Sequence, residues 1–418
     1  MIVFRLALQS LRNRWITALL TVLAIAISVM LLLGVENIRS GARESFSGTI
    51  SGTDLIVGTR TSAMNLLLYS VFRIGNATSN VTWRSYQDIA HRPEVAWAIP
   101  LSLGDSHRGF RVIGTTGDYF THYKFRDGQN LSFADGKAFN DLFDVVIGAE
   151  VATKLNYHLG DKIILSHGVS AIGPKHDDTP FRVSGILNRT GTPVDKSLHV
   201  SLAAIEAIHV DWQAGYRIPG QHTPTDRLRQ LRLEPRAITA ALFGLRSRLQ
   251  VFGFQRYVNE YRKEPMAAIM PGVALQEMWS LVGTAENALM AVSAMVVVTA
   301  ILGMTTMILS TLNERRREIA ILRSLGAGPR TIVGLLVSEA GILTSLGVCF
   351  GTLAMYTALL AVRSLVDHRF GIYLPIDWPS RGELQLLGAI LLGGVVAGLL
   401  PAIRAYRLSL ADGMMVRT

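Results

Sequence analysis

The side chains best suited to bind a metal ion lie between residues 36 and 284, which hold nine of the ten histidines. His176, Asp177 and Asp178 stand side by side, and His158 and His199 are not far along the chain. Imidazole and carboxylate groups bind zinc at about 2.0–2.2 Å. These three adjacent residues are therefore the predicted metal ligands. The plainer alternative is a solvated loop, because no H-x-x-x-H or H-E-x-x-H spacing is present.

A second group of charged residues lies between two apolar runs. Residues 314–327 read E-R-R-R-E-I-A-I-L-R-S-L-G-A. Helical spacing places Ile319, Leu322 and Leu325 on one face, opposite the charges, and Gly326 is expected to end the helix. Such a segment is either a lever at the membrane surface or a basic loop anchored to lipid headgroups.

One carboxylate lies deeper in an apolar run than any other charged group. Glu339 follows the start of the third apolar run, and an ionisable residue inside a membrane span is a functional candidate. A structural or coupling role is the main expectation, because Glu339 is close enough to the end of that span to hydrogen-bond there. A proton relay is the alternative.

Motifs for nucleotide binding and hydrolysis are absent from the sequence. A Walker A loop needs G-x-x-x-x-G-K-[S/T], but the single Gly-Lys pair, Gly136-Lys137, is followed by Ala138. No G-x-S-x-G nucleophile elbow occurs either. The chain is therefore expected not to be an enzyme and to bind no cofactor itself. Its single cysteine, Cys349, excludes an intrachain disulfide.

Four apolar runs must position these groups, in a chain that is 49% hydrophobic and 17% charged. About 20 apolar residues cross a hydrocarbon core of about 30 Å. The first run is too long for the hydrophobic region of a signal peptide, and no A-x-A cleavage site follows it. We therefore predict an α-helical membrane protein with four spans in a one-plus-three arrangement: residues 15–35, 285–312, 331–362 and 384–403.

Arginines beside these runs predict the orientation. They precede the first span, occupy the connection between the second and third, and follow the fourth. By the positive-inside rule, residues 1–14, 313–330 and 404–418 are cytoplasmic, whereas 36–284 and the loop 363–383 face the other side. The net charge of +10 is thus assigned to contacts with membrane lipids, and no nucleic-acid partner is expected.

The segment 36–284 is expected to fold as a large α+β domain with two subdomains, the second a small strand-rich insertion at about 141–225. Alternation and capping predict strands at 54–57, 95–103, 110–115, 144–148, 162–166, 181–187 and 198–201, and helices at 82–91, 149–155 and 202–209. A further helix is predicted from Pro235, because Ile238, Leu242, Leu245 and Leu249 recur at helical spacing.

The order of the charged residues resembles a known family. The string from Arg315 to Ala327, with Glu339 in the following span, resembles the coupling-helix signature of FtsX-like permeases of ABC transporters, which include MacB, LolC and LolE. The ending P-A-I-R-A-Y-R at 401–407 is similar to that of the same permeases. A third match, V-I-G at 146–148 with Ala152, Leu155 and the Gly-Asp pair at 160–161, is similar to their periplasmic core domain.

The resemblance implies a machine of several subunits in a bacterial inner membrane. Two permease subunits, identical or different, pair with two copies of an ATPase that binds ATP and magnesium, and a periplasmic adaptor or substrate-binding protein joins some members. ATP-driven closure is relayed to the periplasmic domains, which is called mechanotransmission. The residues implied in ATPase docking are Glu314, Arg315, Arg316, Arg317, Glu318, Arg323, Gly326 and Ala327.

Two other functions remain open. In FtsX itself the same membrane movement activates a periplasmic hydrolase and nothing is transported, but such proteins usually have a smaller extracytoplasmic domain. The other is metal-linked transport, which the histidines suggest. The large domain here favours MacB- or LolCDE-type export or extraction of a substrate.

Overall fold

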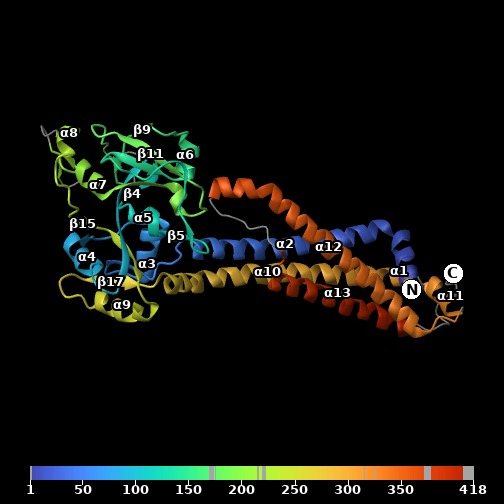
Figure 1. The fold of residues 1–418 in the computed structure, drawn as a ribbon. Helices are drawn as coiled ribbons and strands as arrows, with labels where there is room; N and C mark the ends of the chain where they lie inside the picture. The colour runs from blue at the N-terminus through green and yellow to red at the C-terminus, as the bar shows by residue number, and fades with distance from the viewer. Residues whose placement is uncertain are drawn as a thin grey trace. The chain divides into compact units, whose positions relative to one another are not determined.

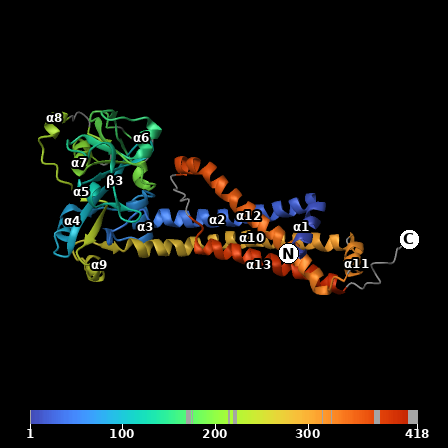
Figure 2. The same cartoon turned by 45° about the vertical axis from the view of Figure 1, so that its right-hand side comes forward.

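The computed structural model describes residues 2–168, 174, 176–213, 216–218, 223–314, 316–324, 326–370 and 378–407. The chain divides into a helical unit, Met1–Gly41, Gly283–Leu365 and Leu374–Thr418, and a sheet-rich unit, Ala42–Val282 and Val366–Tyr373. Helices and strands are drawn in Figures 1 and 2. The boundary between the units falls within two long helices, α2 (Trp15–Ser47) and α10 (Pro271–Glu314).

The helical unit confirms the four predicted spans. Besides the spanning parts of α2 and α10 it contains α1 (Ile2–Asn13), α11 (Arg316–Ser324), α12 (Pro329–Phe370) and α13 (Arg381–Arg407). In both views α10 and α13 run beside each other (Figures 1 and 2). The segments long and apolar enough to cross a membrane are Trp15–Glu44, Pro271–Leu312, Arg330–Val362 and Arg381–Ala405.

Glycines set the distance between three of these helices. A Cβ atom on Gly351 of α12 would lie 2.6 Å from the Ala26 carbonyl oxygen of α2, and one on Gly347 would lie 2.5 Å from Ile25. On α13, a Cβ atom on Gly398 would lie 2.6 Å from the Cβ of Ala340 on α12. Small residues four apart let helix backbones approach closely in a membrane. Both faces of α12 therefore pack through small-residue contacts.

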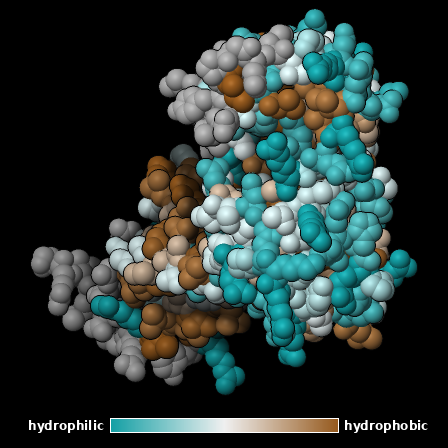
Figure 3. All heavy atoms as spheres, turned by 90° about the vertical axis from the view of Figure 1, so that its left-hand side faces the viewer, coloured by the Kyte–Doolittle hydropathy of each residue, from teal (hydrophilic) through white to brown (hydrophobic). Residues whose placement is uncertain are grey.

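The surfaces of the two units differ in hydropathy. Hydrophilic colour dominates the visible face of the sheet-rich unit in Figure 3, whereas the exposed helices are largely hydrophobic. Leu20, Ile27, Met295 and Leu392 are each at least 60% exposed on helices of the helical unit. Such side chains suit contact with lipid tails or with another apolar helix.

One mixed sheet forms the centre of the sheet-rich unit. Among the described residues it has eleven strands, in the order β17-β1-β16-β3-β4-β12-β8-β11-β7, with β10 beside β3 and β9 beside β11. The pairs β12–β4 and β11–β8 are parallel, and the other neighbours are antiparallel. Its strands are β1 (Leu55–Thr59), β3 (Val95–His107), β4 (Phe110–Thr115), β7 (Phe133–Gly136), β8 (Asp144–Ile147), β9 (Lys162–Ile163), β10 (Ser166–His167), β11 (Phe181–Leu187), β12 (Ser197–Ser201), β16 (Ala240–Leu245) and β17 (Met266–Ile269).

Short helices and hairpins surround this sheet. The helix predicted at 82–91 is α4, and Thr82 caps it by accepting a hydrogen bond from the Ser85 backbone amide. The helices are α3 (Ala63–Leu67), a π-helix (Leu68–Phe72), α4 (Trp83–Ala90), α5 (Asp118–His122), α6 (Ala149–Leu155), α7 (Leu202–Ile208), α8 (Thr225–Leu228), α9 (Val251–Asn259) and two 3₁₀ turns (Pro193–Lys196, Arg248–Gln250). The small strands are β2 (Val81–Thr82), β5 (Lys124–Phe125), β6 (Gln129–Asn130), β13 (Trp212–Gln213), β14 (Tyr216–Arg217) and β15 (Ala237–Ile238).

The helix predicted from Pro235 is wrong. This stretch forms β15 and then β16, a strand paired with β1 on one side and β3 on the other. Every residue of β16 is buried. A short apolar run buried on both faces has no alternation, so periodicity does not separate it from a helix. A glycine is needed at position 244, because a Cβ atom there would clash with the Trp97 ring.

The predicted insertion at 141–225 supplies β8 to β12, which continue the same sheet. These strands share a hydrophobic cluster of buried side chains. It includes Val145, Val151, Phe181 and Leu198, each 0% exposed. A separate cluster lies around β1, β16 and α9. One sheet is thus covered by more than one core, and the strands around 141–225 have a core of their own.

Candidate functional site

The predicted charged segment forms a short helix in the helical unit. Ile319 and Ala320 of α11 are 6% and 8% exposed, while Glu318 is exposed. An acidic residue lies in the first turn and Arg323 in the last, which complements the helix dipole. Gly326, with φ +93°, follows the helix, and the Ala327 amide donates to the Leu322 carbonyl at 2.9 Å. This is the left-handed glycine that the sequence predicts at a helix end.

Only part of the predicted docking surface is described. Arg315 and Leu325 lie outside the described residues, and so do the side chains of Glu314, Arg316 and Arg317. Of the predicted apolar face, Ile319 belongs to the core of the helical unit and Leu322 is half-buried. One side of α11 is therefore attached to the bundle.

Glu339 is buried in the same unit. It is 4% exposed on α12, and its neighbours Leu336, Ala340 and Leu343 belong to the bundle core. Glu286 is the acidic residue of the second predicted span, on α10. Its carboxylate forms an ion pair with the Arg39 guanidinium of α2 at 3.6 Å. A buried carboxylate in a bundle interior suits either a structural or a coupling role.

In the sheet-rich unit, the sheet brings together metal-ligating side chains that are far apart in the sequence. Among the described residues, ligand atoms of Asp105, His167, His176 and His209 all lie within 4.8 Å of one another. Asp105 is on β3 and His167 on β10, and the antiparallel register pairs these two residues directly. Directly opposed residues point to the same face of a sheet. The register alone therefore places the first histidine beside the carboxylate.

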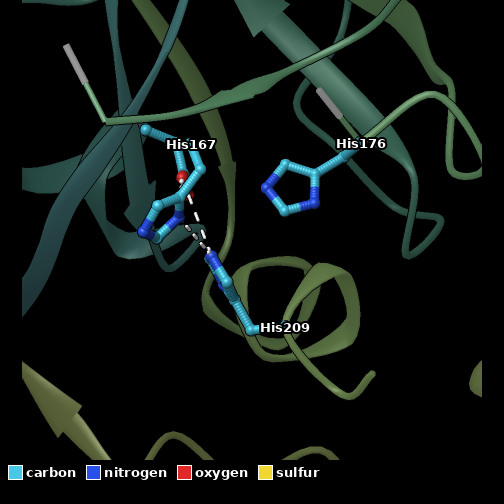
Figure 4. Close-up of side chains that lie close together, drawn as sticks. His167, His176 and His209 are labelled. Atoms are coloured by element: carbon cyan, nitrogen blue, oxygen red, sulfur yellow. Dashed lines mark hydrogen bonds and ion pairs between the residues drawn. The ribbon is translucent and has the colours of Figure 1, made fainter. Parts of the chain in front are cut away.

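The other two histidines approach from a helix end and a loop. His209 follows the last turn of α7. His176 is held by its backbone amide, which donates to the Leu165 carbonyl at 2.9 Å, and the His167 amide donates to the Pro174 carbonyl at 2.8 Å. The labelled rings of His167, His176 and His209 converge in Figure 4.

The distances within the cluster are short. Nδ1 of His167 is 3.0 Å from Nε2 of His209 and 3.3 Å from Oδ1 of Asp105. Nε2 of His209 is 3.7 Å from the same carboxylate oxygen. The Asp105 side chain is 2% exposed, and those of His167 and His209 are 35% and 27% exposed. Solvent therefore reaches the cluster from the side of two histidines.

Neighbouring groups fix the proton positions in part. Nδ1 of His209 is 2.7 Å from the Ile205 carbonyl oxygen, so this nitrogen carries the proton and Nε2 presents a lone pair to the cluster. The Asp105 carboxylate raises the pKa of His167, while partial burial opposes that change. The Asp105 carboxylate therefore favours positive charge at His167.

His176 is the most unusual member. It is fully buried, and neither ring nitrogen has a hydrogen-bond partner among the residues that the structure describes. Its ring centroid lies 4.3 Å from the Trp212 ring. Burial lowers the pKa of His176 to about 4, with the Asp105 charge opposing this. The neutral imidazole is a metal ligand, and a buried polar atom without a partner is costly.

The cluster includes one of the three predicted metal ligands. Asp177 is exposed and Asp178 is half-buried, and neither belongs to the group of converging ligand atoms. His158 lies on the surface near Asp161, at 3.9 Å, and His199 is buried elsewhere. The sequence did not single out Asp105, His167 or His209. The sole local signal was that His209 ends a predicted helix.

Comparison with known families accounts for most of the chain. Residues 18–233 match the model of the MacB-like periplasmic core domain, and residues 290–410 match that of the FtsX-like permease C-terminal region. The chain belongs to this family of MacB-type, FtsX-like permeases. The resemblance predicted from residues 315–327 is thereby confirmed.

Known relatives are similar over different lengths. The macrolide export ATP-binding/permease protein MacB of Azoarcus sp. is 25% identical over 97% of this chain, and that of Nitrobacter winogradskyi is 23% identical over 97%. An ABC transporter permease of Bacillus subtilis, YvrN, is 30% identical over 27% of this chain and 26% of its own length. The chain matches 58% of the length of each of the two MacB proteins.

Two solved structures are also similar to the permease. The periplasmic region of MacB from Actinobacillus actinomycetemcomitans matches with a TM-score of 0.34 and 9% identity, over 55% of this chain and 94% of the other. The extracellular domain of the transporter YknZ from Gram-positive bacteria matches with a TM-score of 0.29 and 14% identity, over 52% of this chain and 99% of the other.

Proposed function

We propose that this chain is the permease subunit of an ATP-driven transporter of the MacB and LolCDE kind in a bacterial inner membrane. ATP hydrolysis by a separate ATPase subunit is coupled to movement of the sheet-rich unit in the periplasm, which exports or extracts a substrate. The proposal rests on the two family matches, residues 18–233 and 290–410. Within the second matched region, the short helix α11 joins two apolar spans.

The basic residues support an orientation with both termini in the cytoplasm. Arg5, Arg12 and Arg14 precede the first span, and Arg404 and Arg407 follow the fourth. The connection that contains α11, residues 313–330, holds five arginines. Lysine and arginine are enriched on the cytoplasmic side of spans, so α11 faces the compartment where ATP is available.

The packing of α11 supports its role as a coupling helix. Ile319 is buried in the bundle core, and the preceding residue, Glu318, is exposed. A partner that binds the charged face therefore moves a helix already attached to the bundle. Because packed interfaces shift between discrete arrangements, binding of ATP biases one arrangement over the other.

The close contacts of α12 support transmission through the bundle. This helix directly follows the coupling helix and packs against both α2 and α13 at glycines with little free space. Tight packing resists local deformation, so movement at one end of α12 is carried along its length. Two permease subunits, identical or different, and two ATPases form the complete transporter, with a periplasmic adaptor or substrate-binding protein as a further partner.

Charge reversal in the coupling segment tests the proposal. The variant R315E/R316E/R317E should lose ATPase capture in a pull-down from detergent-solubilised membranes by at least about tenfold, because reversed charges repel a complementary surface. The matched control R404E/R407E/R417E changes the charge equally on the same predicted side of the membrane and should retain capture. Undiminished capture by the first variant would exclude this segment as the docking site.

A further inference from the structure

Neither the proposed coupling mechanism nor helix packing in the membrane explains the cluster of Asp105, His167, His176 and His209. They are far along the sequence from the coupling helix, and three of them, Asp105, His176 and His209, are buried or mostly buried. Three nitrogen donors and one oxygen donor face one small space. Burying such groups is costly unless something pairs with them.

We propose that Asp105, His167, His176 and His209 bind one divalent cation of the zinc type in the sheet-rich unit. This inference goes beyond the proposed function and does not depend on it. The ligand set is also different from the adjacent His176, Asp177 and Asp178 that the sequence suggests.

The distances suit a tetrahedral ion after small side-chain adjustments. With bonds of about 2.0–2.1 Å, ligand atoms in a tetrahedron lie about 3.3–3.4 Å apart. The distances of 3.0, 3.3 and 3.7 Å among His167, His209 and Asp105 bracket that spacing. The remaining ligand atom, on His176, is within 4.8 Å of the others.

The chemistry of the donors selects the class of metal. Imidazole nitrogens suit zinc, copper and nickel, whereas calcium and magnesium take mainly oxygen ligands. The hydrogen bond from His209 Nδ1 to the Ile205 carbonyl is the outer contact that usually orients a metal-binding histidine. Trp212 packs on the His176 ring and limits its rotation.

A metal-free hydrogen-bond network is the competing explanation. It accounts for His167 and His209, which share one hydrogen bond at 3.0 Å beside Asp105. It does not account for His176, whose two ring nitrogens have no partner within the described part of the chain. An ion would pair with His176 and with the buried oxygen of Asp105 together.

Metal binding by the full chain tests the proposal without the ATPase. The purified protein, in detergent and without a polyhistidine tag, is stripped with a chelator and titrated with zinc against a chromophoric competitor. We expect one zinc per chain by elemental analysis, and cobalt should give the intense visible absorption of a tetrahedral site. Magnesium and calcium should not compete.

Single substitutions assign the ligands. H176Q and D105N should each weaken zinc binding by at least about 100-fold, since even outer contacts contribute about 10–100-fold. H167Q and H209Q, at positions that are 35% and 27% exposed, serve if the buried variants fail to fold by circular dichroism. H199M is the matched control, because His199 is equally buried and also lacks partners among described residues, and it should bind zinc like the wild type.

The outcomes divide cleanly. Loss of the zinc equivalent and of the cobalt absorption in folded H167Q and H209Q supports the site. A wild-type chain that binds no zinc, or an equivalent of zinc that survives both substitutions, overturns it. In the second case the four groups form a metal-free network.

Discussion

Two places in the sheet-rich unit bury a histidine whose ring nitrogens have no hydrogen-bond partner in the described part of the structure, but their surroundings differ. His199 on β12 faces Tyr119 and Phe120, with ring centroids 4.9 and 5.9 Å away. His176 faces two histidines and the Asp105 carboxylate. The comparison shows that burial makes an imidazole neutral in either place, whereas a binding site also needs converging donors.

The pKa values underline this difference. Burial lowers the pKa of His199 to about 3, and the Arg73 charge lowers it further. The Val146 carbonyl opposes that shift without making a hydrogen bond of ordinary geometry to either nitrogen. Burial also lowers the pKa of His176, but there a carboxylate partly opposes it. A shifted pKa therefore does not by itself distinguish packing from binding.

The largest expected effect is stabilisation by zinc. At a zinc concentration about 1,000 times the dissociation constant, binding to the folded state alone adds about 4 kcal/mol to the free energy of unfolding. Thermal unfolding in detergent, followed by near-ultraviolet circular dichroism, should show this gain in the wild type and in H199M. D105N should show none. An equal gain in D105N would place the stabilising ion elsewhere and remove the contrast between the two histidines.

Acid should lower the stability of the folded protein through His199. Its folded-state pKa of about 3 lies below the ordinary 6.5, so only the unfolded chain takes up a proton between these values. Stability therefore falls as the pH drops through that window, by about 1.4 kcal/mol per pH unit, or about 2 kcal/mol between pH 7 and pH 5. The groups that surround this ring are Tyr119, Phe120, Arg73 and the backbone of Val146.

The variant H199M isolates that contribution. Methionine is close in size and cannot be protonated. The stability of H199M relative to that of the wild type should therefore rise as the pH falls from 7 to 5. Unfolding temperatures measured at both pH values in the presence of a chelator check this. A constant difference would mean that His199 is protonated or hydrogen-bonded in the folded protein, unlike the arrangement described.

Aromatic packing should matter for binding at one histidine and not at the other. Trp212 lies 4.3 Å from the His176 ring, so W212L should free that ring and weaken zinc binding by about tenfold. F120L removes an aromatic neighbour of His199 and should leave zinc affinity unchanged. The competitor titration measures both. Equal affinities in W212L and the wild type would show that backbone contacts alone position His176.

The spans and the short helix between the second and third spans could be predicted from the sequence because their signals are local. Each of the four apolar runs is a continuous stretch of sequence. The arginines at 315–317 lie at the start of the short helix that they helped to predict. The strand Ala240–Leu245 was missed because burial on both faces removes the alternation that marks a strand. Local patterns do not show which neighbours a segment will have.

The histidine cluster could not be predicted for the same reason. Asp105 meets His167 through the register of β10, which has only two residues, and the strand was expected to end at Ser166. The helix that ends at His209 was expected, but the group that His209 faces depends on how α7 packs on the sheet. His176 was singled out for its neighbours in sequence, and it is the one predicted ligand that the fold brings to the cluster.

The smallest expected effect comes from the two carboxylates beside His176 in sequence. Asp177 is exposed, and Asp178 acts on His176 through its charge, which favours the protonated form. Removing exposed or half-exposed charges changes binding little because solvent screens them. D177N/D178N should therefore alter zinc affinity by less than about threefold in the competitor titration. A loss as large as that of D105N would make the adjacent residues ligands, and sequence neighbours rather than sheet register would then define the site.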